Sequence, residues 1–103
     1  MAEQSLEYLL GEYDGRRYFL SARARPGFDT PDEFAVVVHY NDPETESSVQ
    51  VARIDTAHGY VHFDRLYRRD EPKEAIDCGF WEAIERLEGN WRTYARGHER
   101  SDR

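Results

Sequence analysis

"VARIDTAHGYVHFD", residues 51–64, is the stretch of sequence that decides the fold. His58 and Gly59 fit the two central positions of a tight turn, so the pattern predicts two short antiparallel strands. Because side chains alternate along a strand, one face of this hairpin is apolar and consists of Ala52, Ile54, Val61 and Phe63. An apolar face must be buried, so the rest of the chain has to supply an element that covers it.

The second face of the hairpin is polar. The tight turn places Asp55 opposite His62 and Arg53 opposite Asp64. A loop that is one pair longer shifts the register by two residues and leaves every side chain on its face. His39 joins this face if the order of the strands brings it near. In either register the predicted polar face holds Val51, Arg53, Asp55, Tyr60, His62 and Asp64.

The C-terminal part of the chain supplies the covering element. From Pro72 onward, apolar side chains recur every three or four residues, which predicts one long helix with a single apolar stripe. We expect Gly89-Asn90 to weaken, kink or end this helix and residues 98–103 to form a frayed tail. The stripe consists of Ile76, Phe80, Ile84, Leu87, Trp91 and Tyr94.

The N-terminal half predicts further strands. Asp14-Gly15 between two apolar runs is a strong hairpin signal, although the leucine spacing over residues 5–10 also fits a short helix. The run at residues 33–41 lacks alternation, which indicates a central strand that is buried on both faces. The expected strands span residues 6–13, 17–25, 33–41, 48–55 and 60–67.

This order of elements predicts the fold class. Strands first and one helix last favour an α+β fold, an antiparallel β-meander of about five strands with one long C-terminal helix packed on one face. Residues 1–97 are expected to form a single α+β domain. The N-terminus lacks the pattern of a signal peptide, and the longest apolar run, "FAVVV", is too short to span a bilayer. Cys78 is the only cysteine and fits a reducing compartment, so we expect a soluble, cytoplasmic protein without membrane contact.

The charge balance is acidic and almost free of lysine. The 103 residues include 21 acidic and 14 basic ones, with a net charge of -7, and Lys73 is the only lysine. This composition is typical of salt-in halophilic archaea, whose proteins use charge to stay soluble in molar salt. An acidic protein from a GC-rich bacterium is the alternative, because codon bias also replaces lysine by arginine. In the halophilic case the acidity says little about partners and would mask a local basic site.

Three interpretations fit the polar face of the hairpin. The first is cross-strand pairing of Arg53 with Asp64 and of Asp55 with His62, at ~0.2–1 kcal/mol per pair and without chemistry. The second is a metal-independent ribonuclease in which Asp55 orients His62, His58 transfers the second proton, and a guanidinium neutralises the phosphorane. The third is a metal site of His58, His62 and an aspartate, although a hairpin splays this spacing.

Two motifs resemble a family of small uncharacterised prokaryotic and haloarchaeal proteins. These carry an RYDTAHG-x-x-H hairpin, matched by residues 53–62, and a C-terminal helix that ends in NW-x-x-Y, matched by residues 90–94. Ile54 stands where the family pattern has tyrosine, and Asp64 lies where related sequences often have a second histidine. This resemblance implies no activity. The hairpin is also similar to that of TumE-type toxins of toxin–antitoxin pairs, which favours the ribonuclease interpretation.

Other residues suggest additional surfaces. Trp81 lies beside the helix stripe, where it either widens the core contact or anchors a second subunit. Cys78 has no histidine near it in the sequence and is expected to pack. A phosphate-binding face is one interpretation of the arginines and tyrosines, and a solvated face paired to carboxylates is the other; the residues are Arg16, Arg17, Tyr18, Arg23, Arg25, Arg65, Tyr67, Arg68 and Arg69.

The sequence therefore leaves two classes of function. The first is a non-catalytic module that forms a homodimer or holds a protein partner, through a sheet edge or Trp81. The second is a toxin-like ribonuclease acting on RNA. Its catalytic candidates are Arg53, Asp55, His58 and His62, and its binding candidates are Tyr60, Asp64 and Arg65. No metal or other cofactor is expected for either class.

Overall fold

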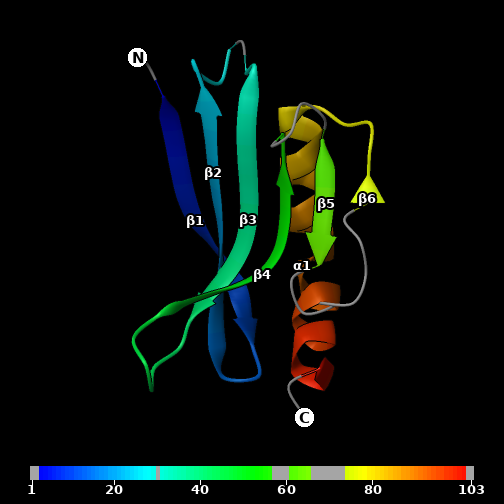
Figure 1. Ribbon diagram of the computed structural model, residues 1–103. Helices are drawn as coiled ribbons and strands as arrows, with labels where there is room; N and C mark the ends of the chain where they lie inside the picture. Colours follow the sequence, from blue (N-terminus) through cyan, green and yellow to red (C-terminus); the bar gives the residue numbers. More distant parts are fainter. Residues whose placement is uncertain (1–2, 30, 57–60, 66–73, 102–103) are drawn as a thin grey trace.

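The computed structural model describes residues 3–29, 31–56, 61–65 and 74–101. Over these residues the chain forms one antiparallel sheet, whose strands follow in sequence order, and one C-terminal helix (Figure 1). The predicted α+β meander is confirmed, and a two-residue strand joins the predicted five. The elements are β1 (Gln4–Tyr13), β2 (Arg16–Arg25), β3 (Glu33–Asn41), β4 (Ser48–Asp55), β5 (His62–Arg65), β6 (Glu74–Ala75) and α1 (Phe80–Ser101).

The first hairpin turns at Asp14 and Gly15, as predicted. Both residues have positive φ angles, 52° and 76°. A two-residue hairpin turn of this kind requires positive φ at both central positions, and Asp-Gly adopts it at little cost. Residues 5–10 lie within the long strand β1, so the helical alternative is wrong.

The hairpin of β4 and β5 has the predicted register. Asp55 lies opposite His62, and Arg53 lies opposite Asp64. The apolar face meets the core, as expected, through Ala52, Ile54, Val61 and Phe63.

One residue of β4 departs from the predicted alternation. Pairing with β3 passes from Val38–Ala52 directly to His39–Gln50, so Val51 is an extra residue in a β-bulge. Val51 is fully buried in the core rather than on the polar face, and its assignment to that face is wrong. Because the bulge moves the alternation by one position, Gln50 joins the face of Arg53.

The helix begins later than predicted. Ile76 precedes it and packs against the core from the connecting segment, while Pro72 lies outside the described residues. The Gly79 carbonyl accepts a hydrogen bond from the Ala83 amide at 2.9 Å, and the Glu82 carboxylate accepts one from the Gly79 amide at 3.3 Å. These bonds satisfy backbone groups of the first turn, and β6 uses the preceding residues to pair with β5.

The helix also ends later than predicted. It continues through Gly89 and Asn90 without a break, and residues 98–101, expected to fray, are helical. His98 contacts the sheet from this last segment, with its Nε2 atom 3.0 Å from the Tyr40 hydroxyl. A polar contact to a core strand therefore holds the turns that local sequence alone would leave loose.

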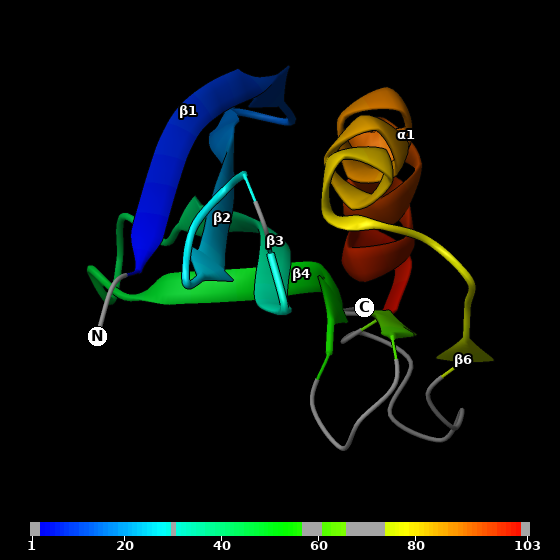
Figure 2. The ribbon, with the colours of Figure 1, turned by 90° about the horizontal axis from the view of Figure 1, so that it is seen from above.

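The apolar stripe of α1 packs on one face of the sheet and forms the core. Three aromatic pairs follow the helix axis: Phe34–Phe80, Tyr18–Trp91 and Phe63–Tyr94, with ring centroids 5.6, 5.3 and 5.4 Å apart. The opposite side of the sheet is called the outer face from here on. In the described part of the chain it carries no helix (Figure 2).

Candidate functional site

The predicted hairpin cluster consists of Arg53, Asp55 and His62 in the described residues. The Arg53 Nε atom forms an ion pair with Asp55 Oδ2 at 2.7 Å, and His62 Nδ1 lies 3.8 Å from Asp55 Oδ1. Asp55 and His62 are 7% and 2% exposed, whereas the Arg53 side chain is 35% exposed. The arginine is therefore the member of this cluster that presents its charge to solvent.

The remaining hairpin candidates have different positions. Arg53 pairs with Asp55 of its own strand rather than with Asp64 across the hairpin, so the expected Arg53–Asp64 ion pair is replaced. The Arg65 guanidinium lies over the Phe63 ring, with its Cζ atom 5.2 Å from the centroid. The catalytic candidate His58 and the binding candidate Tyr60 lie outside the described residues.

A second polar group, the His39 cluster, was not predicted as a group, although His39 was expected to join the polar face if the strand order allowed it. It consists of Glu7, Ser21, His39 and Ser48, from four adjacent strands. His39 Nε2 is 2.6 Å from Ser21 Oγ and 3.1 Å from Glu7 Oε1, while His39 Nδ1 is 3.3 Å from Ser48 Oγ. The ring of Phe19 stacks on the imidazole, 5.8 Å between centroids. The cluster is therefore a buried histidine held on both ring nitrogens.

The hydrogen-bond partners in the His39 cluster favour one tautomer of the imidazole. Glu7 accepts from both neighbours: the Ser21 hydroxyl donates to Oε1 at 2.8 Å, and His39 Nε2 lies 3.1 Å from the same oxygen. Nε2 must then carry a proton, since two acceptors would otherwise face each other. A serine nucleophile needs the reverse arrangement, in which the imidazole accepts the serine proton. In this arrangement Ser21 is a hydrogen-bonding group and not an activated nucleophile.

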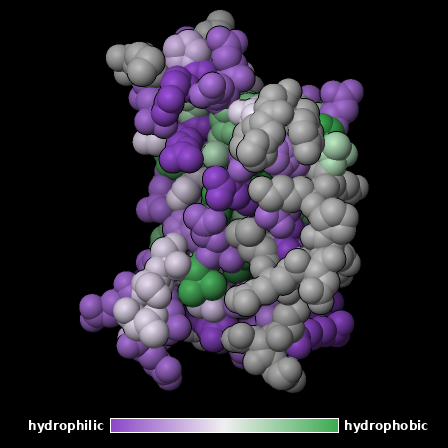
Figure 3. All heavy atoms as spheres, in the orientation of Figure 1, coloured by the Kyte–Doolittle hydropathy of each residue, from purple (hydrophilic) through white to green (hydrophobic). Residues whose placement is uncertain are grey.

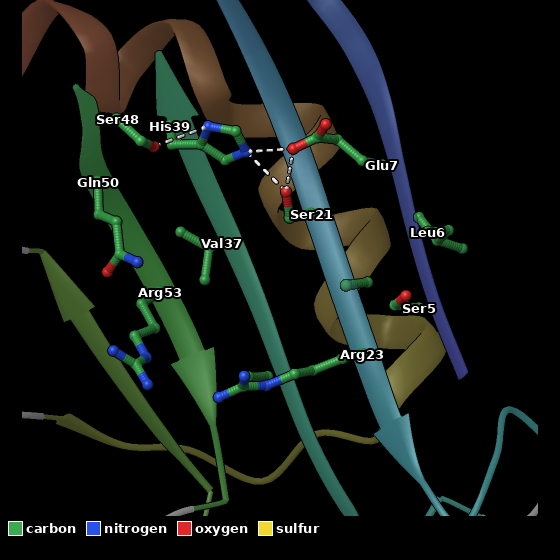
Figure 4. Close-up of a pocket in the computed structure, with 12 residues that line it drawn as sticks. Ser5, Leu6, Glu7, Ser21, Arg23, Val37, His39, Ser48, Gln50 and Arg53 are labelled. Carbon is green, nitrogen blue, oxygen red and sulfur yellow. Dashed lines mark hydrogen bonds and ion pairs between the residues drawn. The ribbon is translucent and has the colours of Figure 1, made fainter. Parts of the chain in front are cut away.

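Both clusters border one hollow on the outer face, with a volume of about 480 Å³. Figure 4 shows this face with α1 behind the sheet: the His39 cluster lies at one end, and Arg23 extends toward Arg53 at the other. The register explains the space between them, because Ala35 and Val37 of β3 form a floor of short side chains. Figure 3 shows that hydrophilic side chains predominate on this side of the molecule.

The predicted arginine and tyrosine face is divided between the two sides of the sheet. Tyr18 is fully buried under α1, and Arg16 lies on that side over the ring of Tyr40. Arg25 is on the outer face but forms ion pairs of 3.8 and 3.9 Å with two glutamates. Of the described residues in that prediction, Arg23 is the one that lines the hollow. Tyr67, Arg68 and Arg69 lie outside the described residues.

Trp81 and Cys78 lie apart from the hollow, at the start of α1. Trp81 is 54% exposed and makes edge contacts with the rings of Phe28 and Phe80, with ring centroids 5.9 and 5.0 Å apart. Burial raises the pKa of the Cys78 thiol, and the Glu82 carboxylate adds to this effect. A raised pKa disfavours the reactive thiolate, which fits the packing role expected for this cysteine.

The described residues lack two kinds of feature. They contain no group of three or more His, Cys, Asp or Glu side chains placed to hold a metal ion. In the same part of the chain, no helix is long and apolar enough to cross a membrane.

Comparisons with known proteins place the chain in one family. No curated protein and no solved structure matches it. The family model that does match covers the whole sequence and carries the description "Domain of unknown function". With a match over residues 1–103, the chain belongs to the family named Domain of unknown function (DUF7718).

Proposed function

We propose that this domain is a non-catalytic interaction module that holds its partner on the outer face of the sheet, in the cytoplasm of a salt-adapted cell. The observation that carries the proposal is the hollow of about 480 Å³, which lies open on that face and is lined by polar and charged side chains. Binding sites in proteins are commonly concave and combine a few placed polar groups with a preformed shape.

The chemistry of the described residues favours binding over catalysis. His62 is almost completely buried, so substrate could reach it only if the surrounding structure moved. His39 already donates toward Glu7 and Ser21, which leaves no unprotonated Nε2 to act as a base on a ligand. These side chains are arranged to fix one another, and fixed polar groups are suited to recognising a surface or a small molecule.

A comparison of two tryptophan variants tests the module. Gln50 is exposed and lines the hollow, so Gln50→Trp should fill part of it without touching the core. Glu85→Trp adds the same side chain to an exposed position on α1 and is the matched control. Tagged wild type and both variants are expressed in the native cells, and co-purified proteins are compared. Light scattering of each purified chain measures self-association.

The module proposal expects one bound species, either a partner or a second copy, that Gln50→Trp loses and Glu85→Trp retains. A homodimer that dissociates in Gln50→Trp alone would make self-association the function of the outer face. A bound species that both variants retain would overturn the outer face as the recognition surface. A chain that stays monomeric and recovers no protein at all would overturn the module as a domain that holds a protein partner or a second copy.

The ribonuclease is the second candidate, favoured by the presence of Arg53 in the lining of the hollow beside the predicted hairpin. Growth of cells that express wild type or His62→Ala separates it from the module. The module expects equal growth of the two strains. Growth arrest by wild type together with RNA cleavage, both relieved in His62→Ala, would replace the module by the ribonuclease.

A further inference from the structure

The end of the hollow opposite the His39 cluster brings two arginines together. We propose that the hollow binds a small molecule with one carboxylate or phosphate group, which Arg23 and Arg53 clamp, and with a hydroxyl or amino donor for Glu7. This inference rests on one part of the proposed function, that the outer face is a recognition surface, and it assigns a small-molecule ligand to the hollow on that face.

The register explains why two guanidinium groups meet at one place. Arg23 lies on β2 and Arg53 on β4, on either side of β3. Their partners on β3 are Ala35 and Val37, which are too short to fill the space between the flanking strands. Figure 4 shows Arg23 extending over this floor toward Arg53. Guanidinium groups that approach from two sides can each donate two parallel hydrogen bonds to an oxyanion.

The local charges favour binding of an anion at the end of the hollow where Arg23 and Arg53 lie. Asp55 balances the charge of Arg53 through the 2.7 Å ion pair. Arg23 is exposed, and the described residues give it no ion pair and no hydrogen bond. Of the described residues that line the hollow, Glu7 alone carries a carboxylate, and it lies in the His39 cluster. One uncompensated positive charge therefore remains between the two arginines, in a protein whose net charge is -7.

The other end of the hollow, where Glu7 lies, favours a hydrogen-bond donor instead of an anion. Oε1 of Glu7 accepts the Ser21 hydroxyl and lies 3.1 Å from His39 Nε2, and the Glu7 side chain remains 58% exposed. A carboxylate in this position accepts further hydrogen bonds and attracts a ligand's hydroxyl or ammonium group. The ligand is therefore asymmetric, with an anion at the arginines and a donor at Glu7. The volume lies within the range of known small-molecule sites, roughly 300–1,000 Å³.

Titration of the intact protein with four probes tests this assignment. The probes are inorganic phosphate, glycerol 3-phosphate, glycerate and glycerol, each followed by nuclear magnetic resonance of the backbone amides and arginine Nε–H groups. Saturable shifts around Ala35 and Val37 are expected for the anionic probes and none for glycerol. A comparison of glycerate with glycerol 3-phosphate identifies the preferred anion, and glycerol 3-phosphate should bind more tightly than inorganic phosphate because it also offers hydroxyl donors.

Three substitutions and a control decide which residues hold the probes. Arg23→Gln and Arg53→Gln are each expected to weaken glycerol 3-phosphate binding by about tenfold or more, since each removes charge-assisted hydrogen bonds. Glu7→Gln should weaken glycerol 3-phosphate but not inorganic phosphate. Arg25→Gln is the control, because Arg25 lies on the same strand and face but outside the lining.

The inference is overturned if no anionic probe gives saturable shifts, or if Arg23→Gln binds glycerol 3-phosphate as tightly as wild type. Arg53→Gln could disturb the fold, because Arg53 forms an ion pair with the buried Asp55. The binding measured for Arg23→Gln remains decisive in that case, because Arg23 is exposed and its replacement leaves the core unchanged. Failure here is distinct from failure of the module: a partner that Gln50→Trp loses would leave the outer face as a recognition surface while these probes do not bind.

Discussion

Tyr18 shows how strongly a single residue depends on its surroundings. Its side chain is fully buried between the rings of Tyr40 and Trp91, at centroid distances of 5.2 and 5.3 Å. Burial raises the pKa of Tyr18 from 10.0 to about 12, although the nearby guanidinium of Arg16 acts in the opposite direction. A charged phenolate is unfavourable in this aromatic layer, so the hydroxyl keeps its proton longer in the folded chain than in the unfolded one.

This raised pKa predicts a loss of stability at alkaline pH. Between pH 10 and about pH 12 the unfolded chain releases the Tyr18 proton while the folded chain retains it. The stabilisation is therefore complete below pH 10 and is lost as the pH rises through the folded value, by about 3 kcal/mol in total. Urea unfolding across this pH range measures it. The free energy of unfolding of Tyr18→Phe should not show this alkaline decrease, whereas that of Tyr13→Phe should show it as wild type does. An identical alkaline profile for wild type and Tyr18→Phe would refute the prediction.

At the scale of elements, the hairpins were predictable from local signals, and the limits of the helix were not. Asp14-Gly15 specified its turn because few residues adopt positive φ, and the alternation of β4 and β5 specified their register. The helix start depended on β6, and its end on the contact of His98 with Tyr40. Both depend on residues distant in sequence, and such tertiary contacts routinely override local propensity.

Gly11 faces the helix α1 from the sheet, and Gly89 lies within α1. Replacing each of them by alanine is expected to change the stability of the fold in opposite directions. A Cβ atom at Gly11 of β1 would lie 2.8 Å from Cζ2 of Trp91, whose ring is buried and cannot retreat, so Gly11→Ala should destabilise the fold by about 1–3 kcal/mol. A Cβ atom at Gly89 meets nothing within 4 Å, so Gly89→Ala should stabilise the fold by about 1 kcal/mol through helix propensity.

Urea denaturation of both variants measures the two free energies of unfolding, and each variant serves as the control for the other. Opposite signs are the expected result. A Gly11→Ala variant as stable as wild type would mean that β1 and α1 can move apart at Trp91 without cost. A destabilised Gly89→Ala variant would mean that a break at this glycine is part of the native helix.

At the scale of the whole molecule, the site was less predictable than the fold. The hairpin pairing required only one turn, and Asp55 opposite His62 follows from it. The hollow required the order of four strands and the bulge at Val51, which brings Gln50 onto the outer face. No local pattern places Glu7, Ser21 and His39 together, because they meet only after β1, β2 and β3 have paired. Arg23 lies beside Arg53 only because β3 pairs with β2 on one side and with β4 on the other.

The net charge of -7 predicts that salt stabilises the molecule. Like charges on one compact surface repel one another, and folding concentrates them. The screening length falls from about 10 Å at 0.1 M salt to about 3 Å at 1 M, which removes most of this repulsion. The short ion pair of Arg53 with the buried Asp55 is screened much less than exposed charges. Thermal unfolding should therefore occur at a higher temperature in molar KCl than in dilute buffer.

A variant of lower charge separates this repulsion from a general effect of salt. Glu12, Asp29 and Glu85 are exposed, and their combined replacement by Gln, Asn and Gln reduces the magnitude of the net charge by three. Its midpoint should be higher than that of wild type in dilute buffer and should rise less with KCl. Parallel salt dependences for the two proteins would assign the stabilisation to apolar burial, which salt strengthens irrespective of charge. A wild-type midpoint that does not rise with KCl would contradict the prediction that repulsion among the excess acidic charges destabilises the fold in dilute buffer.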